Sequence, residues 1–232
     1  MIRKMTRTRI SRTDVMVMSE AFYKLHAWMS PSYPVGAYTY SHGLEWTIEA
    51  GHVCDAASAQ SYIADCLILG AGRTDAILLA CAWRAERAGD ATALDDIAEL
   101  ASALAPSAER LLETEAQGAA FARVTDEAWG GTGPAPYPVA IGRTAAIHDI
   151  PLDDTLAIYL QAFVTNLISA AIRLVPLGQT EGVGIAADLM SSVHQVQEEA
   201  RTATLDSVGG CAIRADISSM RHETQTTRLF RS

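Results

Sequence analysis

The sequence contains almost no lysine, and this shortage removes several kinds of chemistry. Lys4 and Lys24 stand beside sixteen arginines, and neither lies in the G-x-x-x-x-G-K-[ST] pattern of a phosphate-binding loop. A mechanism that forms a Schiff base on lysine is disfavoured for the same reason. The sequence also has no G-x-S-x-G and no H-E-x-x-H motif. It therefore offers no common catalytic signature.

Cysteines and long apolar runs are also scarce. The four cysteines are isolated and form no C-x-x-C pair, which is typical of reduced thiols in a cytoplasmic protein. There is no run of 18 apolar residues and no secretory leader, so we expect no membrane span. A net charge of −9 and a pI near 5.1 would repel a phosphate backbone, so we expect no nucleic-acid partner.

The residues that are abundant indicate helices. Hydrophobic residues make up 49% of the 232 residues, which is typical of a globular chain. Apolar residues between 152 and 174 recur at three- and four-residue steps, Asp153 and Asp154 favour the first turn, and Pro176 ends the pattern. Stretches in which polar and apolar residues alternate, as they do in a β-strand, are short. We therefore predict an all-α fold, a single helical-bundle domain of roughly eight to ten helices. The expected helices include 56–69, 74–88, 91–104, 107–128, 152–174 and 185–205.

Three parts are expected along the chain. Residues 1–18 are basic and predicted to be flexible, residues 19–218 form the helical domain, and residues 219–232 form a C-terminal tail. The turn-rich stretch 129–138 is interpreted as a loop within one bundle, because neither half has a strand set of its own. Basic ends on an acidic body are either solvated termini or docking segments, and the composition alone leaves both open.

Residues 30–46 form an aromatic stretch punctuated by two prolines and two glycines, S-P-S-Y-P-V-G-A-Y-T-Y-S-H-G-L-E-W. Aromatic groups with hydroxyl tips suit an interface, but a structured loop between helices explains them equally well. A helix is expected to start near Ser41, which would place His42 and Glu45 on one face. That pair is the basis of one alternative function, a small all-α hydrolase that uses a bound metal.

Two later segments also read as interfaces. Arg173, in the last turn of the helix 152–174, begins the segment R-L-V-P-L-G-Q-T-E-G, where it complements the helix dipole or anchors a partner. The end of the chain reads S-M-R-H-E-T-Q-T-T-R-L-F-R-S. A solvated tail gains nothing from Met220, Leu229 and Phe230, so folding onto a partner explains them better.

These three segments together resemble the signatures of the UreF family of urease accessory proteins. The likeness runs from about Trp28 to Ser232, and it departs at Thr226, where the family usually has tyrosine. The resemblance implies an all-helical homodimer that works with UreD (also called UreH) and the GTPase UreG. That complex delivers nickel to apo-urease. UreF recruits UreG and couples GTP hydrolysis to nickel transfer, has no catalysis of its own, and passes nickel transiently without a stable cofactor.

The resemblance also implies roles for individual residues. Tyr38 and Arg173 would face UreG, and Pro34 would lie near an internal passage for nickel. The tail would dock on UreD and support the dimer through Met220, Arg221, His222, Glu223, Arg228, Leu229 and Phe230. The hydrolase using His42 and Glu45, and a helical adaptor unrelated to nickel, remain as alternatives that metal content and partner identity would separate.

Overall fold

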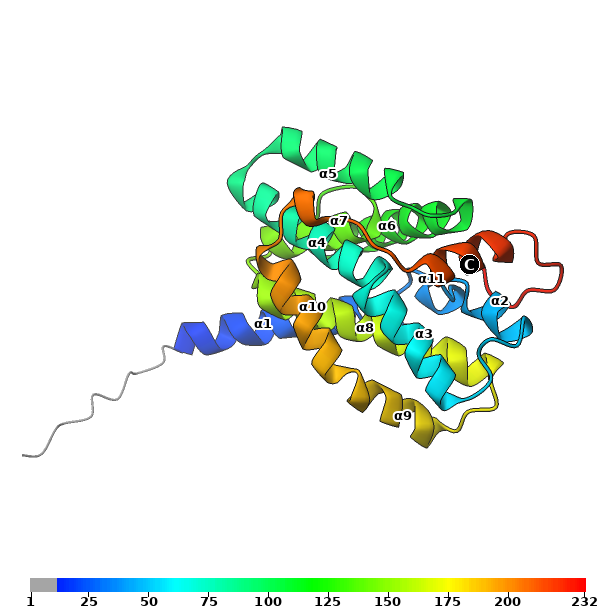
Figure 1. Cartoon of the computed structure of the whole chain (residues 1–232). Helices are drawn as coiled ribbons and strands as arrows, with labels where there is room; N and C mark the ends of the chain where they lie inside the picture. Colours follow the sequence, from blue (N-terminus) through cyan, green and yellow to red (C-terminus); the bar gives the residue numbers. More distant parts are fainter. Residues whose placement is uncertain (1–11) are drawn as a thin grey trace, which may run out of the picture.

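Helices make up nearly all regular structure in residues 12–232, the part that the computed structural model describes, with side chains from Glu20 onward. No strand occurs within this range, which confirms the all-α prediction. Figure 1 shows the helices packed side by side, with α1 projecting from the bundle. In order they are α1 (Arg12–Trp28), η1 (Ala37–Thr39), α2 (Leu44–Glu49), α3 (Ala56–Ile68), α4 (Ala71–Ala88), α5 (Ala91–Ala103), α6 (Ala108–Trp129), α7 (Tyr137–Ile147), α8 (Leu152–Leu174), α9 (Gln179–Asp188), α10 (Met190–Thr202), η2 (Leu205–Ser207) and α11 (Ile213–His222).

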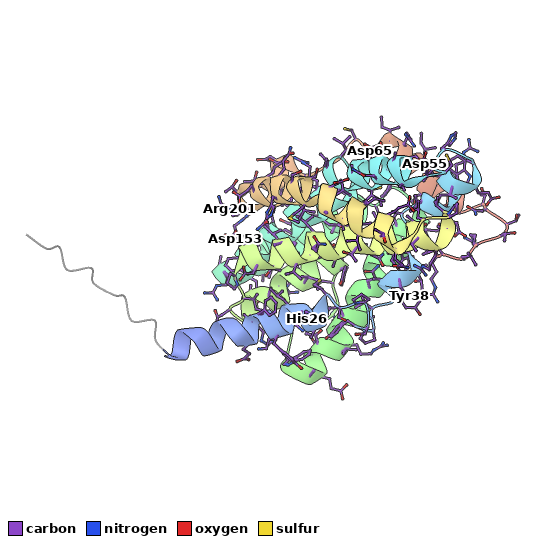
Figure 2. All side chains as sticks on the ribbon, turned by 90° about the horizontal axis from the view of Figure 1, so that it is seen from below. His26, Tyr38, Asp55, Asp65, Asp153 and Arg201 are labelled. Carbon is purple, nitrogen blue, oxygen red and sulfur yellow. The ribbon has the colours of Figure 1, made fainter. Side chains whose placement is uncertain are left out.

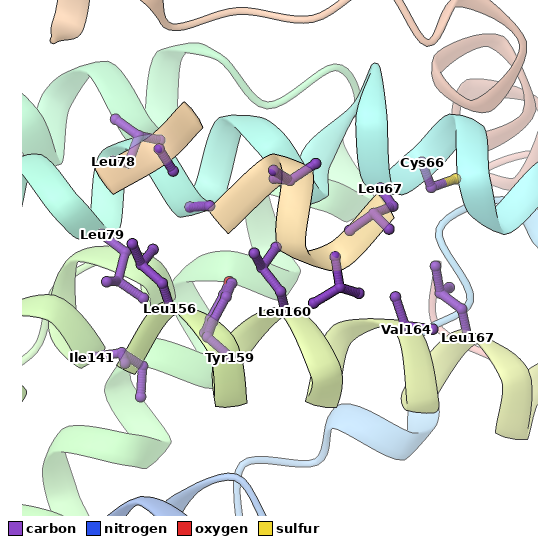
Figure 3. Packing of buried hydrophobic residues seen from close by; sticks show 14 of the residues in the cluster. Cys66, Leu67, Leu78, Leu79, Ile141, Leu156, Tyr159, Leu160, Val164 and Leu167 are labelled. Atoms are coloured by element: carbon purple, nitrogen blue, oxygen red, sulfur yellow. The ribbon is translucent and has the colours of Figure 1, made fainter. Parts of the chain in front are cut away.

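Helix α8 is the centre of the hydrophobic core. Its observed bounds, Leu152–Leu174, are those that the apolar periodicity predicts. Leu156, Leu160 and Leu167 have no exposed surface, and Figure 3 shows them facing the residues of α3 and α4. Each such leucine contributes roughly 1.5–3 kcal/mol through burial, so this stripe strongly favours the packing of α8 against its neighbours.

Helices α4 and α7 approach each other unusually closely because of one glycine. A Cβ atom on Gly142 of α7 would lie 2.3 Å from the carbonyl oxygen of Leu79 in α4. Any larger residue would therefore push the helices apart. Helix α7 begins just after the turn-rich loop, which joins α6 to α7 within the same bundle.

Local capping explains where several helices begin. The Asp55 carboxylate accepts a hydrogen bond from the amide of Ser58 at 2.8 Å, and Asp90 does the same for Ala93 at 3.0 Å. The predicted helix at 185–205 is wrong, because the structure breaks it at Leu189 into α9 and α10. Ile185, Leu189 and Val193 are all buried, so the apolar period continues across the break and conceals it.

The expected ends of the helical domain fall inside helices. Helix α1 already begins at Arg12, and the part of the predicted segment 1–18 before Arg12 lies outside the described residues. At the other end, α11 runs through residue 219 as far as His222. The stretches Ala56–Ala88 and Leu152–Leu174 are long and apolar enough to cross a membrane, but 61% and 50% of their apolar windows are buried inside the bundle. Core packing accounts for their hydrophobicity.

Candidate partner surface and internal cavities

The three interface-like segments of the sequence meet at one place on the surface. The guanidinium of Arg173, in the last turn of α8, donates to the carbonyl oxygen of Tyr38 at 2.7 Å. The same guanidinium lies over the ring of Phe230, with its carbon 4.4 Å from the ring centre, within the range of a cation–π contact. We call Tyr38, Arg173 and Phe230 the docking face. Tyr38 is 58% exposed, whereas Phe230 is buried beneath the guanidinium of Arg173.

Backbone hydrogen bonds join the end of the chain to the loop that carries Tyr38. The amide of Arg231 donates to the carbonyl oxygen of Thr39 at 2.7 Å, and the amide of Ser41 donates to Ser232 at 2.6 Å. The last residues of the chain therefore run alongside the loop that carries Tyr38. Figure 1 shows the red C-terminal loop beside α2. The position of Tyr38 therefore depends on Arg231 and Ser232, which lie about 190 positions later in the sequence.

Glu45 holds residues 223–232, which we call the C-terminal segment. Its buried carboxylate accepts hydrogen bonds from the amides of Leu229 at 2.7 Å and Phe230 at 2.9 Å. It also pairs with Nε2 of His222 at 3.0 Å. Charged acceptors of this kind form the stronger class of hydrogen bond. Glu45 thus binds both ends of the loop that follows α11.

A second carboxylate supports the same segment from α6. Glu109 accepts from Nδ1 of His222 at 2.6 Å and from the guanidinium of Arg228 at 2.6 Å. The imidazole of His222 is completely buried between Glu45 and Glu109. The segment, which the sequence predicts to fold onto a partner, is thus already packed against the bundle.

Gly43 explains why α11 can lie so close to the start of α2. A Cβ atom on Gly43 would meet the backbone nitrogen of Ser219 at 2.5 Å, and its φ of +76° is one that glycine adopts without strain. The predicted helix start near Ser41 is wrong by three residues, because α2 begins at Leu44. His42 lies before the helix with a φ of 54°.

This geometry separates His42 from Glu45. His42 Nε2 lies 3.2 Å from Glu113 and 3.0 Å from the guanidinium of Arg110, whereas Glu45 binds the C-terminal segment. The expectation that His42 and Glu45 share a helix face is therefore wrong. The residue pair does not form the acid–base couple on which the hydrolase alternative depends.

His42, Arg110 and Glu113 form a buried ionic cluster. Arg110 and Glu113 are one turn apart on α6 and make a direct salt bridge. Burial and the neighbouring Arg110 lower the pKa of His42, so its imidazole is neutral at pH 7. Burial alone would raise the pKa of Glu113, but Arg110 and His42 outweigh it and lower that pKa to about 2. The cluster is therefore a fixed cation and anion beside a neutral imidazole.

Two cavities reach this cluster from different sides of the fold. The smaller, about 240 Å³, lies among the ends of α3 and α5, the start of α4, and α11. The larger, about 440 Å³, lies among α1, α6, α8 and the loop before η1, on the side where Figure 2 labels His26 and Tyr38. We call the residues that line both cavities the junction. They are His42, Asp75, Arg110 and Thr114.

Potential nickel ligands are spread out within the smaller cavity. Its walls include His42, Cys66, Asp75 and Asp216. Burial raises the pKa of Cys66 to about 12, so its thiol is protonated. Across the described side chains, no three of the histidine, cysteine, aspartate and glutamate residues gather closely enough to hold a metal ion.

The remaining predicted residues lie at the surface. Pro34 is exposed and lines neither cavity, although Pro31 and Val35 beside it line the larger one. Met220 is 49% exposed, and Arg221 is also exposed. Glu223 is exposed and accepts a hydrogen bond from the amide of Ala108 at 2.8 Å, which caps the start of α6. Thr226 is exposed as well.

Sequence reasoning missed the charged residues of α6. Arg110, Glu113 and Gln117 follow the same helical spacing as the buried Phe121, so they fall on the inward face. Charged residues on an apolar stripe are the signal that could have located the ionic cluster. Such residues are rarely buried unless they are paired.

The fold and the site define a class of protein: an all-helical bundle in which three distant segments build one exposed face above a buried ionic cluster. The sequence profile of the UreF family matches residues 53–190. The chain is 50% identical over 222 residues to the urease accessory protein UreF of Rhodopseudomonas palustris (strain HaA2), across 91% of this chain and 94% of that one.

Two further relatives carry the same name. The chain is 52% identical over 216 residues to urease accessory protein UreF of Cereibacter sphaeroides (strain KD131), across 93% of this chain and 100% of that one. It is 50% identical over 218 residues to the protein of that name in Xanthobacter autotrophicus (strain Py2), across 90% of each. The chain belongs to the UreF family.

Proposed function

We propose that this protein is a cytoplasmic urease maturation chaperone without catalysis of its own. It acts as a homodimer with UreD and UreG in the complex that inserts nickel into apo-urease. It recruits UreG and couples the GTPase cycle of UreG to nickel transfer. Relatives that share about half of its residues are named urease accessory proteins, which supports this role.

The docking face is the observation that carries the proposal. Tyrosine and arginine are the residue types that most often dominate binding energy, and here they lie side by side although 135 positions separate them. Tyr38 is held by its backbone, so its side chain is free for a partner. We assign this face to UreG.

The C-terminal segment has an inward and an outward side, which suits an adaptor between two partners. Within it, the buried Phe230 anchors the segment and Leu229 is 76% exposed. On α11, just before the segment, His222 is buried and Met220 is 49% exposed. Exposed apolar side chains held on an anchored loop are suited to a further protein contact. We assign Met220, Arg221, Arg228 and Leu229 to contact with UreD.

The two cavities support a route for nickel through the chain. They share the junction residues, and the smaller cavity is lined by imidazole, thiol and carboxylate groups that do not form a closed metal site. Conduction needs contacts strong enough to admit an ion and weak enough to release it. Nickel is thus cargo in transit, and the exposed Pro34 marks the rim near the larger cavity.

Alanine variants of the docking face test the recruitment of UreG. Tyr38→Ala and Arg173→Ala should each weaken UreG binding, in the presence of UreD, by about 2 kcal/mol or more, roughly thirtyfold. Arg201→Ala is the matched control, because Arg201 is also an exposed arginine in the last turn of a helix, α10. Binding is measured by titration calorimetry and stability by the melting temperature.

The outcomes separate binding from folding. Lost UreG affinity with an unchanged melting temperature supports the face, and it separates this proposal from an adaptor unrelated to nickel, which would not bind UreG. Arg173 also serves the helix dipole, which is worth about 0.3–1 kcal/mol of stability. If Arg173→Ala only lowers the melting temperature and binds UreG normally, the residue is structural and the assignment is wrong.

A further inference from the structure

The junction is the one set of residues in the described structure that lines both cavities. His42, Asp75, Arg110 and Thr114 come from the loop before α2, from α4 and from α6. Tyr38 and Phe22, both exposed, line the larger cavity, whereas the exposed Gly210 lines the smaller one. Anything that crosses between the cavities passes these four side chains.

The carboxylate of Glu113 is not free to bind an ion at the junction. One oxygen accepts from Gln117 at 3.1 Å and lies 3.2 Å from Nε2 of His42. The other accepts from Ser232 Oγ at 2.8 Å and pairs with Arg110. Three donors, Gln117, Ser232 and Arg110, therefore bind its two oxygens, and Glu113 serves to hold Arg110 in place.

Asp75 is placed differently. It is the acidic residue that faces both cavities, and its described hydrogen bond comes from the hydroxyl of Tyr159 at 3.2 Å. An oxygen of its carboxylate therefore remains for an ion. Carboxylate and imidazole groups both bind Ni²⁺, so Asp75 and the neutral His42 are suitable first contacts.

We propose that the junction is an ion gate in which Asp75 receives a divalent cation and the fixed positive charge of Arg110 prevents the ion from staying. This inference rests on the nickel route proposed above. Glu113 offsets part of the Arg110 charge, but Arg110 lowers the pKa of Asp75 more than Glu113 raises it, so Arg110 still weakens the binding of a cation to Asp75. The gate therefore favours passage over storage.

Variants of Asp75 and Arg110 separate the binding of the cation at the junction from its release. Asp75→Asn removes the receiving carboxylate with little change of shape, and Arg110→Gln removes the repelling charge. Arg110→Lys keeps that charge and is the matched control. Because Arg110→Gln leaves the Glu113 carboxylate unpaired, the double variant Arg110→Gln/Glu113→Gln, which leaves no unpaired buried charge, shows whether the tighter Ni²⁺ binding persists without that carboxylate. Asp95→Asn controls for the loss of one acid, because Asp95 is exposed on α5 and lines neither cavity.

Two measurements are made on each full-length variant. Equilibrium dialysis against Ni²⁺ measures retention by the chain alone, and urease activation is followed in a mixture with UreD, UreG and apo-urease. We expect Asp75→Asn to slow activation at least tenfold while it still assembles with UreD and UreG. We expect Arg110→Gln to bind Ni²⁺ at least tenfold more tightly than wild type, and Arg110→Lys to bind it as wild type does.

A third variant distinguishes failure of the gate from failure of the route. Thr114→Met inserts a longer side chain into the junction and should stop activation if nickel passes there. If Thr114→Met stops activation but Asp75→Asn activates urease at the wild-type rate, the gate is wrong and the route stands. If Thr114→Met assembles normally and activates normally, both the route and the gate are wrong, whereas the docking face is unaffected.

Discussion

Tyr38 and His42 lie four positions apart in one loop, yet they belong to opposite kinds of environment. Tyr38 is 58% exposed, and its neighbours hold it through its backbone oxygen. His42 is buried among Arg110, Glu113 and the ring of Phe163, whose centre is 5.0 Å from its own. The loop therefore builds an adaptable contact surface on one side and a rigid ionic cluster on the other.

The contrast shows how one short segment can serve two roles without conflict. The exposed side chain of Tyr38 contributes little to the core, so it can be optimised for a partner. Residues of the ionic cluster must satisfy one another, because an unpaired buried charge costs several kcal/mol. Substitutions on the two sides should therefore have opposite signatures: lost binding with intact folding, or lost folding.

The strongest test of this contrast is the removal of a buried charge. Glu113→Ala leaves Arg110 and His42 without their acceptor, and we expect a loss of about 3–5 kcal/mol in the free energy of unfolding, measured with urea. Glu115→Ala, at an exposed position two residues further along α6, should change it by less than about 0.5 kcal/mol. Equal effects of the two variants would show that the cluster is not a special part of the fold.

A somewhat smaller effect is expected at the boundary between the two regions. Glu45→Ala removes the acceptor of His222 and of two backbone amides, and we expect a loss of about 2–3 kcal/mol. The C-terminal segment should then be released, and trypsin should cut after Arg228 much faster than in wild type. Glu115→Ala, at an exposed position on α6, is the control. Unchanged cleavage in Glu45→Ala would mean that other contacts hold the segment.

The smallest effect concerns Asp75 and depends on pH. Burial raises the pKa of Asp75 from 3.8 to about 6, so the folded state opposes its ionisation and the residue costs stability above pH 6. That cost fades as the pH falls towards 3.8, where the folded and unfolded states both become protonated. Asp75→Asn should therefore stabilise the protein by about 1–2 kcal/mol at pH 8 and have little effect at pH 4. Denaturant titrations at the two pH values measure this, and a gain that is equal at both would refute it.

Much of the fold could be predicted because apolar spacing decides which helix faces are buried. The central helix is the clearest case, since its stripe of leucines and its closing Pro176 leave little freedom. The break at Leu189 could not be predicted, because the stripe continues through it. Helix α2 starts later than expected because Gly43 is needed for the close approach of α11, a tertiary contact that no local pattern reveals.

The site could be predicted only in its exposed part. Tyr38 and Arg173 attract attention through their residue types beside proline- and glycine-containing turns, and the structure places them together. The partners of His42 and Glu45 could not be found in the sequence, because Arg110 and His222 lie 68 and 177 positions away from them. Long-range pairing of buried charges depends on the tertiary fold.

The hydrogen bonds between Glu45 and the amides of Leu229 and Phe230 also have a consequence for biosynthesis. These bonds join residues 184 and 185 positions apart, so the loop that carries Tyr38 leaves the ribosome long before its supports are made. At about 5–20 residues per second, that interval lasts roughly ten seconds or more. The docking face is therefore completed only near the end of translation, and an interrupted chain would lack the arginine–aromatic contact needed to engage a partner prematurely.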